Sequence, residues 1–166
     1  MTLVINTKTH KLKKILPIAL LLLIANNSQA QEPVEIDKLV FGTYYGMCKG
    51  KCVHVYELDN AGLRRDDSAH YGSLNWAYYF TATGKMTAEQ HRAASPLLKK
   101  VPLELCNKNR VTIGSPDSHD QGGIYLEIVS GPADVRMKLD IDDTPEQSAE
   151  VRAFKKQLLG LIEKMK

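Results

Sequence analysis

Short runs of β-branched and aromatic residues dominate the first half of the chain and predict strands. Lys38–Tyr45 and Cys52–Leu58 are two such runs, and neither alternates cleanly between apolar and polar positions. Because apolar side chains point to both sides of these strands, we expect both faces to be covered. The turn-forming residues 59–62 predict a returning strand over Leu63–Asp67, and the aromatic-rich run Leu74–Ala82 predicts a fourth strand.

Two helical segments are expected next. Thr87 and Gln90 are spaced as in a capping box, in which each side chain bonds to the backbone of the other residue, and this predicts the start of a helix. Pro96 follows Ser95, so the chain either kinks at this point or begins a second short helix that runs to Lys100.

A short strand, Arg110–Ile113, is predicted after these helices, and the clearest hairpin of the sequence follows it. The two strands of the hairpin are Ile124–Val129 and Val135–Ile141. In the second of them apolar residues alternate with charged ones, which indicates that one face of the strand is buried and the other contacts water.

The last element is an amphipathic helix, which Thr144 is expected to cap and in which Pro145 suits the first position. The whole pattern predicts a single α+β domain over residues 38–166. Its antiparallel sheet has about six to seven strands, and a middle helix and the C-terminal helix pack on one side of it. The apolar residues of the last helix recur at three- and four-residue steps, as packing requires, and they are Val151, Phe154, Leu158, Leu161, Ile162 and Met165.

Residues 1–30 have the composition of a secretory signal peptide. Four lysines and no acidic residue come first, an apolar run of eleven residues follows, and a small-residue pattern leads to cleavage after Ala30. The apolar run is shorter than the roughly 20 residues that span a membrane, so we expect no stable membrane anchor after cleavage; an uncleaved anchor is the alternative. The sequence therefore predicts a periplasmic or secreted protein with a flexible leader over residues 31–37.

Removal of the signal peptide changes the charge balance. The chain has 22 lysine and arginine residues against 19 aspartate and glutamate residues, and cleavage removes four of the lysines. The remaining chain is close to neutral, so it offers no strong electrostatic attraction to the phosphates of a nucleic acid. We expect the partner to be an unknown protein or small ligand in the cell envelope, and no nucleic acid.

Three cysteines remain in the exported part, and an oxidising compartment favours a disulfide between two of them. Loop-closure entropy favours the longer loop, between Cys52 and Cys106. Proximity favours Cys48 and Cys52 instead, since residues that face each other across a hairpin lie at the distance that a disulfide requires. We expect the bond between Cys48 and Cys52, and the role of Cys106 stays open.

The same hairpin carries a second chemical possibility. Cys48, Cys52 and His54 have the donor atoms of a zinc site, and Lys49 and Lys51 would lower the pKa values of the two thiols. A metal- or thiol-dependent periplasmic enzyme centred on these residues is therefore the alternative. A structural disulfide, with no metal and no cofactor, is favoured because C-x-x-x-C is a loose motif and no second cysteine pair accompanies it.

No catalytic motif stands out elsewhere. The serines, aspartates and histidine of residues 115–120 share one loop, whereas the members of a catalytic triad come from separate parts of a fold, so a polar turn is favoured. The aromatic residues around position 78 would offer a stacking surface for a sugar or a partner's side chain, but packing in the core is favoured. The sequence thus predicts a non-enzymatic binding or interaction module, and its possible binding residues are Lys49, Lys51, His54, Trp76, Tyr78 and Asp120.

The predicted exported part contains several short motifs. They are Gly46, Cys48, Cys52 and Tyr56 in the cysteine hairpin, the pair Pro102-Leu103, and the run Asp120–Tyr125. Together with the closing helix, they resemble an uncharacterised family of small secreted bacterial proteins. The chain departs from the commonest form of that family, which has two residues between the cysteines and a proline after the second. The resemblance implies export and a compact α+β domain opened by a cysteine-containing hairpin, and it implies no particular activity.

The expected cleavage and disulfide can be checked together by the intact mass of protein purified from cells that express the full chain. The mass should correspond to a chain that begins at Gln31, and reduction should add two hydrogen atoms, because a single disulfide opens. A mass that still includes residues 1–30 would contradict the cleavage, and a mass unchanged by reduction would contradict the disulfide.

Overall fold

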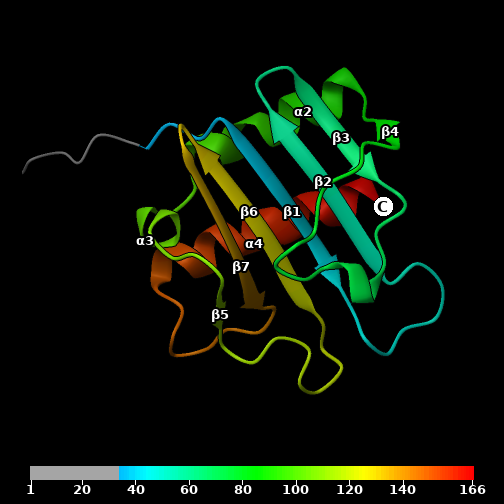
Figure 1. The fold of residues 1–166 in the computed structure, drawn as a ribbon, viewed down its shortest axis with the longest axis vertical. Helices are drawn as coiled ribbons and strands as arrows, with labels where there is room; N and C mark the ends of the chain where they lie inside the picture. Colours follow the sequence, from blue (N-terminus) through cyan, green and yellow to red (C-terminus); the bar gives the residue numbers. More distant parts are fainter. Residues whose placement is uncertain (1–33) are drawn as a thin grey trace, which may run out of the picture. The chain divides into compact units, whose positions relative to one another are not determined.

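One mixed sheet of seven strands forms the centre of the protein in the computed structural model, which describes residues 34–166 (Figure 1). The predicted signal peptide, residues 1–30, lies outside the described residues. The strands are β1 (Lys38–Tyr44), β2 (Val53–Asp59), β3 (Gly62–Asp66), β4 (Gly84–Lys85), β5 (Val111–Ile113), β6 (Gly123–Ser130) and β7 (Ala133–Asp140). The helical segments are η1 (Tyr71–Ser73), α2 (Ala88–Ala94), η2 (Ser95–Lys99), α3 (Leu103–Cys106) and α4 (Ala149–Met165).

The strands lie in the order β4-β3-β2-β1-β6-β7-β5, so the hairpins predicted from the sequence meet at the central pair of β1 and β6. All neighbours run antiparallel except β5 and β7, which are parallel. A hairpin turn joins antiparallel strands, whereas β5 follows α3 and is separated from its neighbour β7 by β6. The predicted α+β class is confirmed, and the sheet departs from antiparallel pairing at this one edge.

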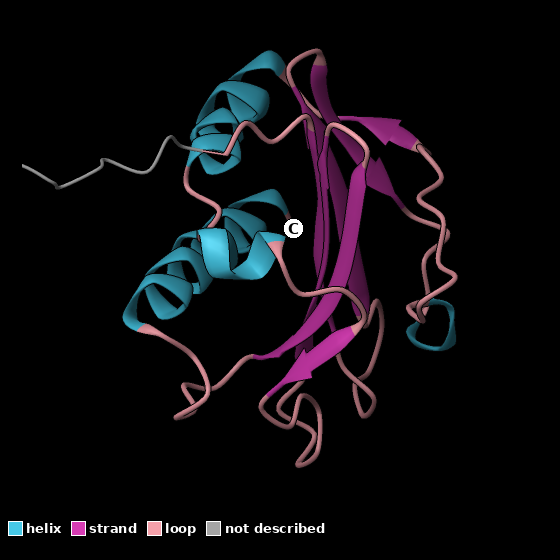
Figure 2. Ribbon diagram, turned by 60° about the vertical axis from the view of Figure 1, so that its left-hand side comes forward, coloured by secondary structure: helices cyan, strands magenta, loops and turns pink. Residues whose placement is uncertain are grey.

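The helices pack on one face of the sheet (Figure 2). Five of the six apolar residues predicted for the buried side of α4 are buried there, and Leu161 packs against them. Across the sheet, Phe41 of β1 lies opposite Tyr56 of β2, and their rings stack with centroids 5.7 Å apart. Within residues 34–166, no helix has the length and apolar character that a membrane crossing requires.

The capping box predicted at residue 87 is present at the start of α2. Thr87 Oγ1 accepts a hydrogen bond from Gln90 N at 3.2 Å, and Gln90 Oε1 accepts one from Thr87 N at 2.9 Å. The short turn η2 follows without a break, with Pro96 in its first turn, which is the second of the two alternatives that the sequence leaves open.

Among residues 34–166, no layer of α-helices covers the opposite face of the sheet. Val40, Val55 and Tyr125 point to this face and are fully buried. Residues 67–83, which we name the covering segment, cross over them with only the short turn η1 and no strand (Figure 2). The strand predicted over Leu74–Ala82 is therefore wrong. Leu74 and Tyr78 of this run are buried, but against the face of the sheet, and the run does not pair along its edge.

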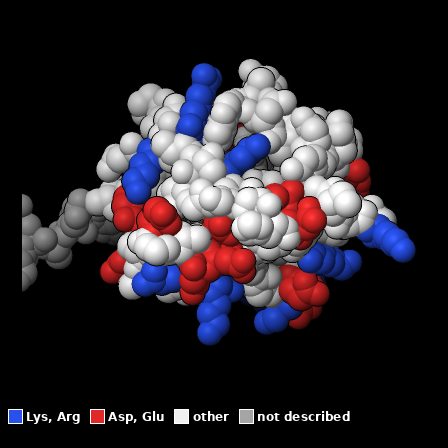
Figure 3. All heavy atoms as spheres, turned by 90° about the horizontal axis from the view of Figure 1, so that it is seen from below, with Lys and Arg blue, Asp and Glu red and all other residues white. Residues whose placement is uncertain are grey.

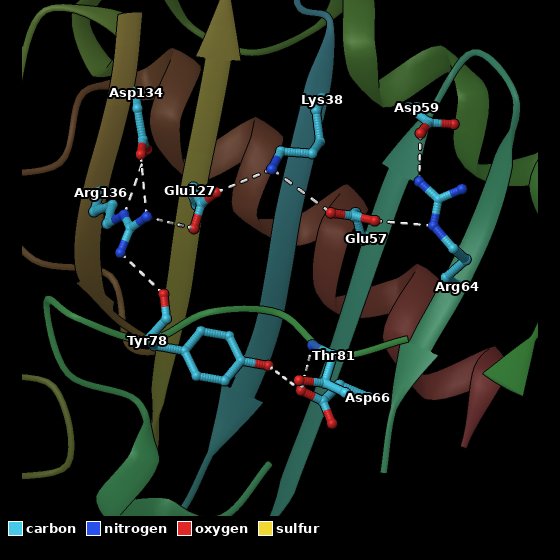
Figure 4. Close-up of polar contacts among 10 residues, drawn as sticks. All are labelled: Lys38, Glu57, Asp59, Arg64, Asp66, Tyr78, Thr81, Glu127, Asp134 and Arg136. Atoms are coloured by element: carbon cyan, nitrogen blue, oxygen red, sulfur yellow. Dashed lines mark hydrogen bonds and ion pairs between the residues drawn. The ribbon is translucent and has the colours of Figure 1, made fainter. Parts of the chain in front are cut away.

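The carboxylate of Asp66, buried at the end of β3, anchors the covering segment (Figure 4). It accepts hydrogen bonds from Tyr78 Oη at 2.6 Å, from Thr81 N at 3.1 Å, and from the backbone N–H and hydroxyl of Ser68 at 2.8 and 2.5 Å. Burial by itself raises the pKa of Asp66, but these hydrogen bonds outweigh burial and lower the pKa below its usual value. The ionised carboxylate thus holds the covering segment at several points.

Arg136 of β7 is a second anchor of the covering segment (Figure 4). Its guanidinium donates hydrogen bonds to the carbonyl oxygens of Trp76 at 3.0 Å and Tyr78 at 2.9 Å. The same guanidinium pairs with Asp134 at 3.0 Å and with Glu127 at 3.5 Å. Arg136 therefore joins the covering segment to a row of charges on the sheet.

The row of charges continues across the sheet beyond Glu127 (Figure 4). Lys38 of β1 lies 3.3 Å from Glu127 and 3.6 Å from Glu57 of β2, and Glu57 also pairs with Arg64 of β3 at 2.9 Å. Positive and negative groups alternate, so each partly buried charge has an opposite neighbour. The same face of the sheet is therefore apolar at one end and carries this row of paired charges at the other.

The last helix begins later than the sequence pattern predicts. The sequence places Thr144 and Pro145 at its start, but the N-cap is Ser148, whose hydroxyl accepts a backbone hydrogen bond of 3.2 Å. Residues 144–147 form a turn instead, because Gln147 is buried and its side chain donates to the carbonyl oxygen of Asp140 at 3.0 Å. A helix starting at Pro145 would not preserve that turn.

The part of the predicted leader that the structure describes is attached to the sheet. Ile36 is buried in the core on the helix side. Ser130 Oγ donates to the carbonyl oxygen of Glu35 at 2.7 Å, and Asp37 accepts from Gly131 N at 2.6 Å. Residues 34–37 therefore differ from the flexible leader predicted over residues 31–37, because Ile36 contributes an apolar side chain to the core.

Substitution of Asp66 by Asn is expected to destabilise the protein by roughly 2–4 kcal/mol, because an amide replaces a buried acceptor of several hydrogen bonds. Folding lowers the pKa of Asp66, so its stabilisation is fully present above the unfolded pKa of 3.8 and is lost as pH falls through the folded value. Denaturant unfolding of wild type and Asp66→Asn, at neutral pH and well below pH 3.8, measures the difference.

Tyr78→Phe removes a single hydrogen bond to the same carboxylate and is expected to cost about 1–2 kcal/mol. The matched control is Tyr79→Phe, since Tyr79 is the exposed neighbour and its ring is retained. Equal stability of Asp66→Asn and wild type at neutral pH would show that Asp66 is not an anchor.

Candidate functional site

A cleft of about 380 Å³ opens on the sheet face that the covering segment protects. One side is formed by Tyr44 at the end of β1 and by Tyr71 and Leu74 of the covering segment. The other side is formed by Thr112 of β5 and by the loop 114–122, and Lys138 of β7 completes the lining. This volume lies in the range of small-molecule binding sites.

The side of the cleft on β1 depends on a close approach of Tyr44 to Gly123. These residues are partners across β1 and β6, and a side-chain carbon on Gly123 would collide with the Tyr44 ring and hydroxyl. Glycine therefore lets the Tyr44 ring lie over β6. Tyr44 is buried, and burial is the main cause that raises the pKa of its phenol, which stays neutral.

Lys138 brings a positive charge to the cleft. Its Nζ lies 5.5 Å from the centroid of the Tyr44 ring and 5.5 Å from that of the Trp76 ring, within the range of cation–π contacts. Partial burial lowers the pKa of Lys138, and no carboxylate of residues 34–166 forms an ion pair with it. An anion in the cleft would therefore meet an ammonium group that no neighbouring carboxylate neutralises.

Asp117 draws three loops together beside the cleft. Its carboxylate accepts hydrogen bonds from Gly46 N, next to the cysteine loop, at 2.8 Å and from Gly122 N at 3.0 Å. Tyr71 of the covering segment contacts the same carboxylate, and hydrogen bonding to Asp117 is the main cause that raises the pKa of its phenol. Figure 3 shows this end of the molecule, where acidic and basic side chains are interspersed.

The ring of Tyr71 is held in place but accessible. It makes an edge contact with Tyr44, with centroids 5.8 Å apart and planes inclined by 64°, while Asp117 holds its hydroxyl. The residue is nevertheless 49% exposed. An accessible aromatic ring with a fixed orientation is suited to stack against a ligand.

The predicted disulfide between Cys48 and Cys52 is confirmed, with Cα atoms 5.7 Å apart. It closes the tip of the connection between the end of β1 and the start of β2, and Met47, directly before Cys48, is 75% exposed. Cys106 is half-buried and has no disulfide partner among the described residues, and burial raises the pKa of its thiol. A protonated thiol is a poor nucleophile.

Three of the predicted binding residues belong to the cysteine hairpin and are not among the residues that line the cleft. Lys49 is exposed, and Lys51 forms an ion pair with Asp67. His54 is half-buried on β2, and its pKa is lowered first by burial and then by the charges of Lys166 and Lys51. The imidazole of His54 is therefore neutral at pH 7.

The other three predicted binding residues have different surroundings. Trp76 lies beside Lys138, next to the cleft. Tyr78 is buried and bonds to the Asp66 carboxylate, and Asp120 is exposed with a φ of 60°. The sequence did not predict Lys138 as a binding residue. The alternating pattern of its strand predicts the face on which Lys138 lies, but it does not predict that the covering segment crosses over that face.

The loop 115–120 is a polar turn, as favoured from the sequence. Ser118 N donates to Ser115 O at 3.2 Å, and His119 N donates to Gln121 Oε1 at 2.7 Å. Across residues 34–166, no three His, Cys, Asp or Glu side chains gather as a metal ion would require.

Comparison of the chain with family models, curated proteins and solved structures finds no match. The resemblance to a family of small secreted bacterial proteins stays a prediction.

Asp117→Asn is expected to destabilise the protein by about 1–3 kcal/mol, because the amide cannot accept from both Gly46 N and Gly122 N. Hydrogen exchange at these two amides should accelerate as the loops separate. Denaturant unfolding and amide exchange measure the two effects.

Asp120→Asn is the matched control for this substitution, because Asp120 lies in the same loop with the same φ of 60° but is exposed. It should leave the unfolding free energy and both exchange rates unchanged. If the two variants behave alike, Asp117 does not join the loops.

Proposed function

We propose that the protein is a non-enzymatic binding module of the periplasm or extracellular space, and that it binds a small anionic ligand in the cleft around Lys138. The export signal expected over residues 1–30 supports the location. The Cys48–Cys52 disulfide is consistent with an oxidising compartment.

The observation that carries this proposal is the state of the Lys138 side chain. Its ammonium lies against the rings of Tyr44 and Trp76, and no carboxylate of residues 34–166 pairs with it. Arg136, two residues away on the same strand, has two carboxylate partners. A partly buried charge without a partner is unfavourable for folding, so its presence in a cleft favours a role in binding.

The surroundings of Lys138 favour attraction of an anion over acid–base chemistry. The residues of 34–166 that line the cleft include no carboxylate, imidazole or thiol. Aromatic rings and hydroxyl groups orient a ligand but do not by themselves exchange protons with it near pH 7. Binding without catalysis is therefore the function that these side chains support best.

Lys138→Met should weaken the binding of anions in the cleft. Trp76 is the single tryptophan of the chain and lies beside Lys138, so its fluorescence reports occupancy. Titration with citrate, glutamate, glucuronate and inorganic phosphate is expected to shift this fluorescence for at least one anion in wild type. The affinity for that anion should fall at least about tenfold in Lys138→Met, because a charge-assisted contact is lost.

Lys99→Met is the matched control, since Lys99 is exposed on η2 and is not among the residues that line the cleft. It should bind as wild type does. Thermal unfolding should show that Lys138→Met remains folded, because methionine removes a charge whose burial is unfavourable. An anion affinity in Lys138→Met equal to that of wild type, or no response in wild type, would contradict the proposal.

A further inference from the structure

The lining of the cleft narrows the chemistry of the ligand. Building on the proposed function, we infer that the cleft takes an acidic saccharide, meaning a sugar ring that carries a single carboxylate. Three features carry this inference: an aromatic ring on one side of the cleft, hydroxyl groups on the other, and one cation.

The aromatic side of the cleft fits the apolar face of a sugar ring. Tyr71 is 49% exposed, its ring contacts Tyr44 edge-on, and its hydroxyl is held at Asp117. A pyranose directs several C–H bonds to one face, and this face packs on an aromatic ring with little loss of side-chain entropy when the ring is already oriented.

The opposite side of the cleft fits the hydroxyl groups of a sugar. Thr112, Ser115 and Ser118 line it, and all three residues are exposed. A side-chain hydroxyl both donates and accepts hydrogen bonds, so it can pair with a sugar hydroxyl in either direction. A purely apolar ligand would leave these three groups without partners.

The charge of the cleft fits one carboxylate better than a phosphate. Lys138 is the only charged residue among the described residues that line the cleft. Proteins usually hold a phosphate with several donors, such as an arginine fork or the backbone N–H groups at a helix N-terminus. Neither lines this cleft within residues 34–166, whereas one ammonium balances one carboxylate.

Fluorescence titration of Trp76 tests the inference with four probes, D-glucuronate, D-glucose, acetate and inorganic phosphate. The protein is purified from cells that express the full chain. Glucuronate is expected to bind on the order of tenfold more tightly than each of the other three, because it alone combines the sugar ring with a carboxylate.

Two variants of Tyr71 distinguish the contribution of the stacking ring from that of the contact between its hydroxyl and Asp117. Tyr71→Ala should weaken glucuronate binding roughly three- to tenfold through loss of the ring. Tyr71→Phe keeps the ring and loses only the contact with Asp117, so it should bind within about twofold of wild type. Lys138→Met should reduce the affinity for glucuronate to that for glucose.

Acetate or phosphate binding as tightly as glucuronate would overturn the saccharide inference and leave the proposed function standing. An equal loss of affinity in Tyr71→Phe and Tyr71→Ala would also overturn it, because the ring would then not be the contact. No response to any of the four probes would overturn the inference, and it would overturn the proposed function as well if citrate and glutamate also gave no response.

Discussion

The central strands of this protein are buried on both faces, whereas the α-helices of residues 34–166 cover only one. Val40, Val55 and Tyr125 have to be shielded from water by a segment without regular secondary structure. Such a segment satisfies only some of its backbone groups internally, so side chains of the sheet bind others. Asp66 and Arg136 fill this role, one accepting backbone and hydroxyl hydrogens and the other donating to carbonyl oxygens.

This way of covering the sheet also creates the candidate binding site. The covering segment spans part of the face and leaves a gap toward β5, into which Lys138 projects its charge. The charges of the row on the same face have opposite partners, as Arg136 has in Glu127 and Asp134. Lys138 has aromatic rings in place of a carboxylate, which distinguishes the site from the rest of the face.

The sequence predicts the local elements well and their assembly poorly. The alternation over Val135–Ile141 and the Thr87–Gln90 capping box involve neighbouring residues only, so their physics is contained in the sequence. The run 74–82 misleads because aromatic residues indicate burial without saying whether the backbone pairs along a sheet edge. The sequence predicts the face of the strand on which Lys138 lies. The rings beside it belong to residues 44 and 76, and only the tertiary fold brings them close to Lys138.

The residues that line the cleft lie far apart in the sequence, and this has a consequence for the order of folding. Tyr44, Tyr71, Ser115 and Lys138 become neighbours only when most of the chain has closed its loops, and such non-local contacts form late. The disulfide, in contrast, joins residues four apart and constrains only its own loop. A chain in which only the hairpins and helices had formed would have no cleft. A competent cleft is thus a property of the fully assembled native state and a sensitive marker of its completion.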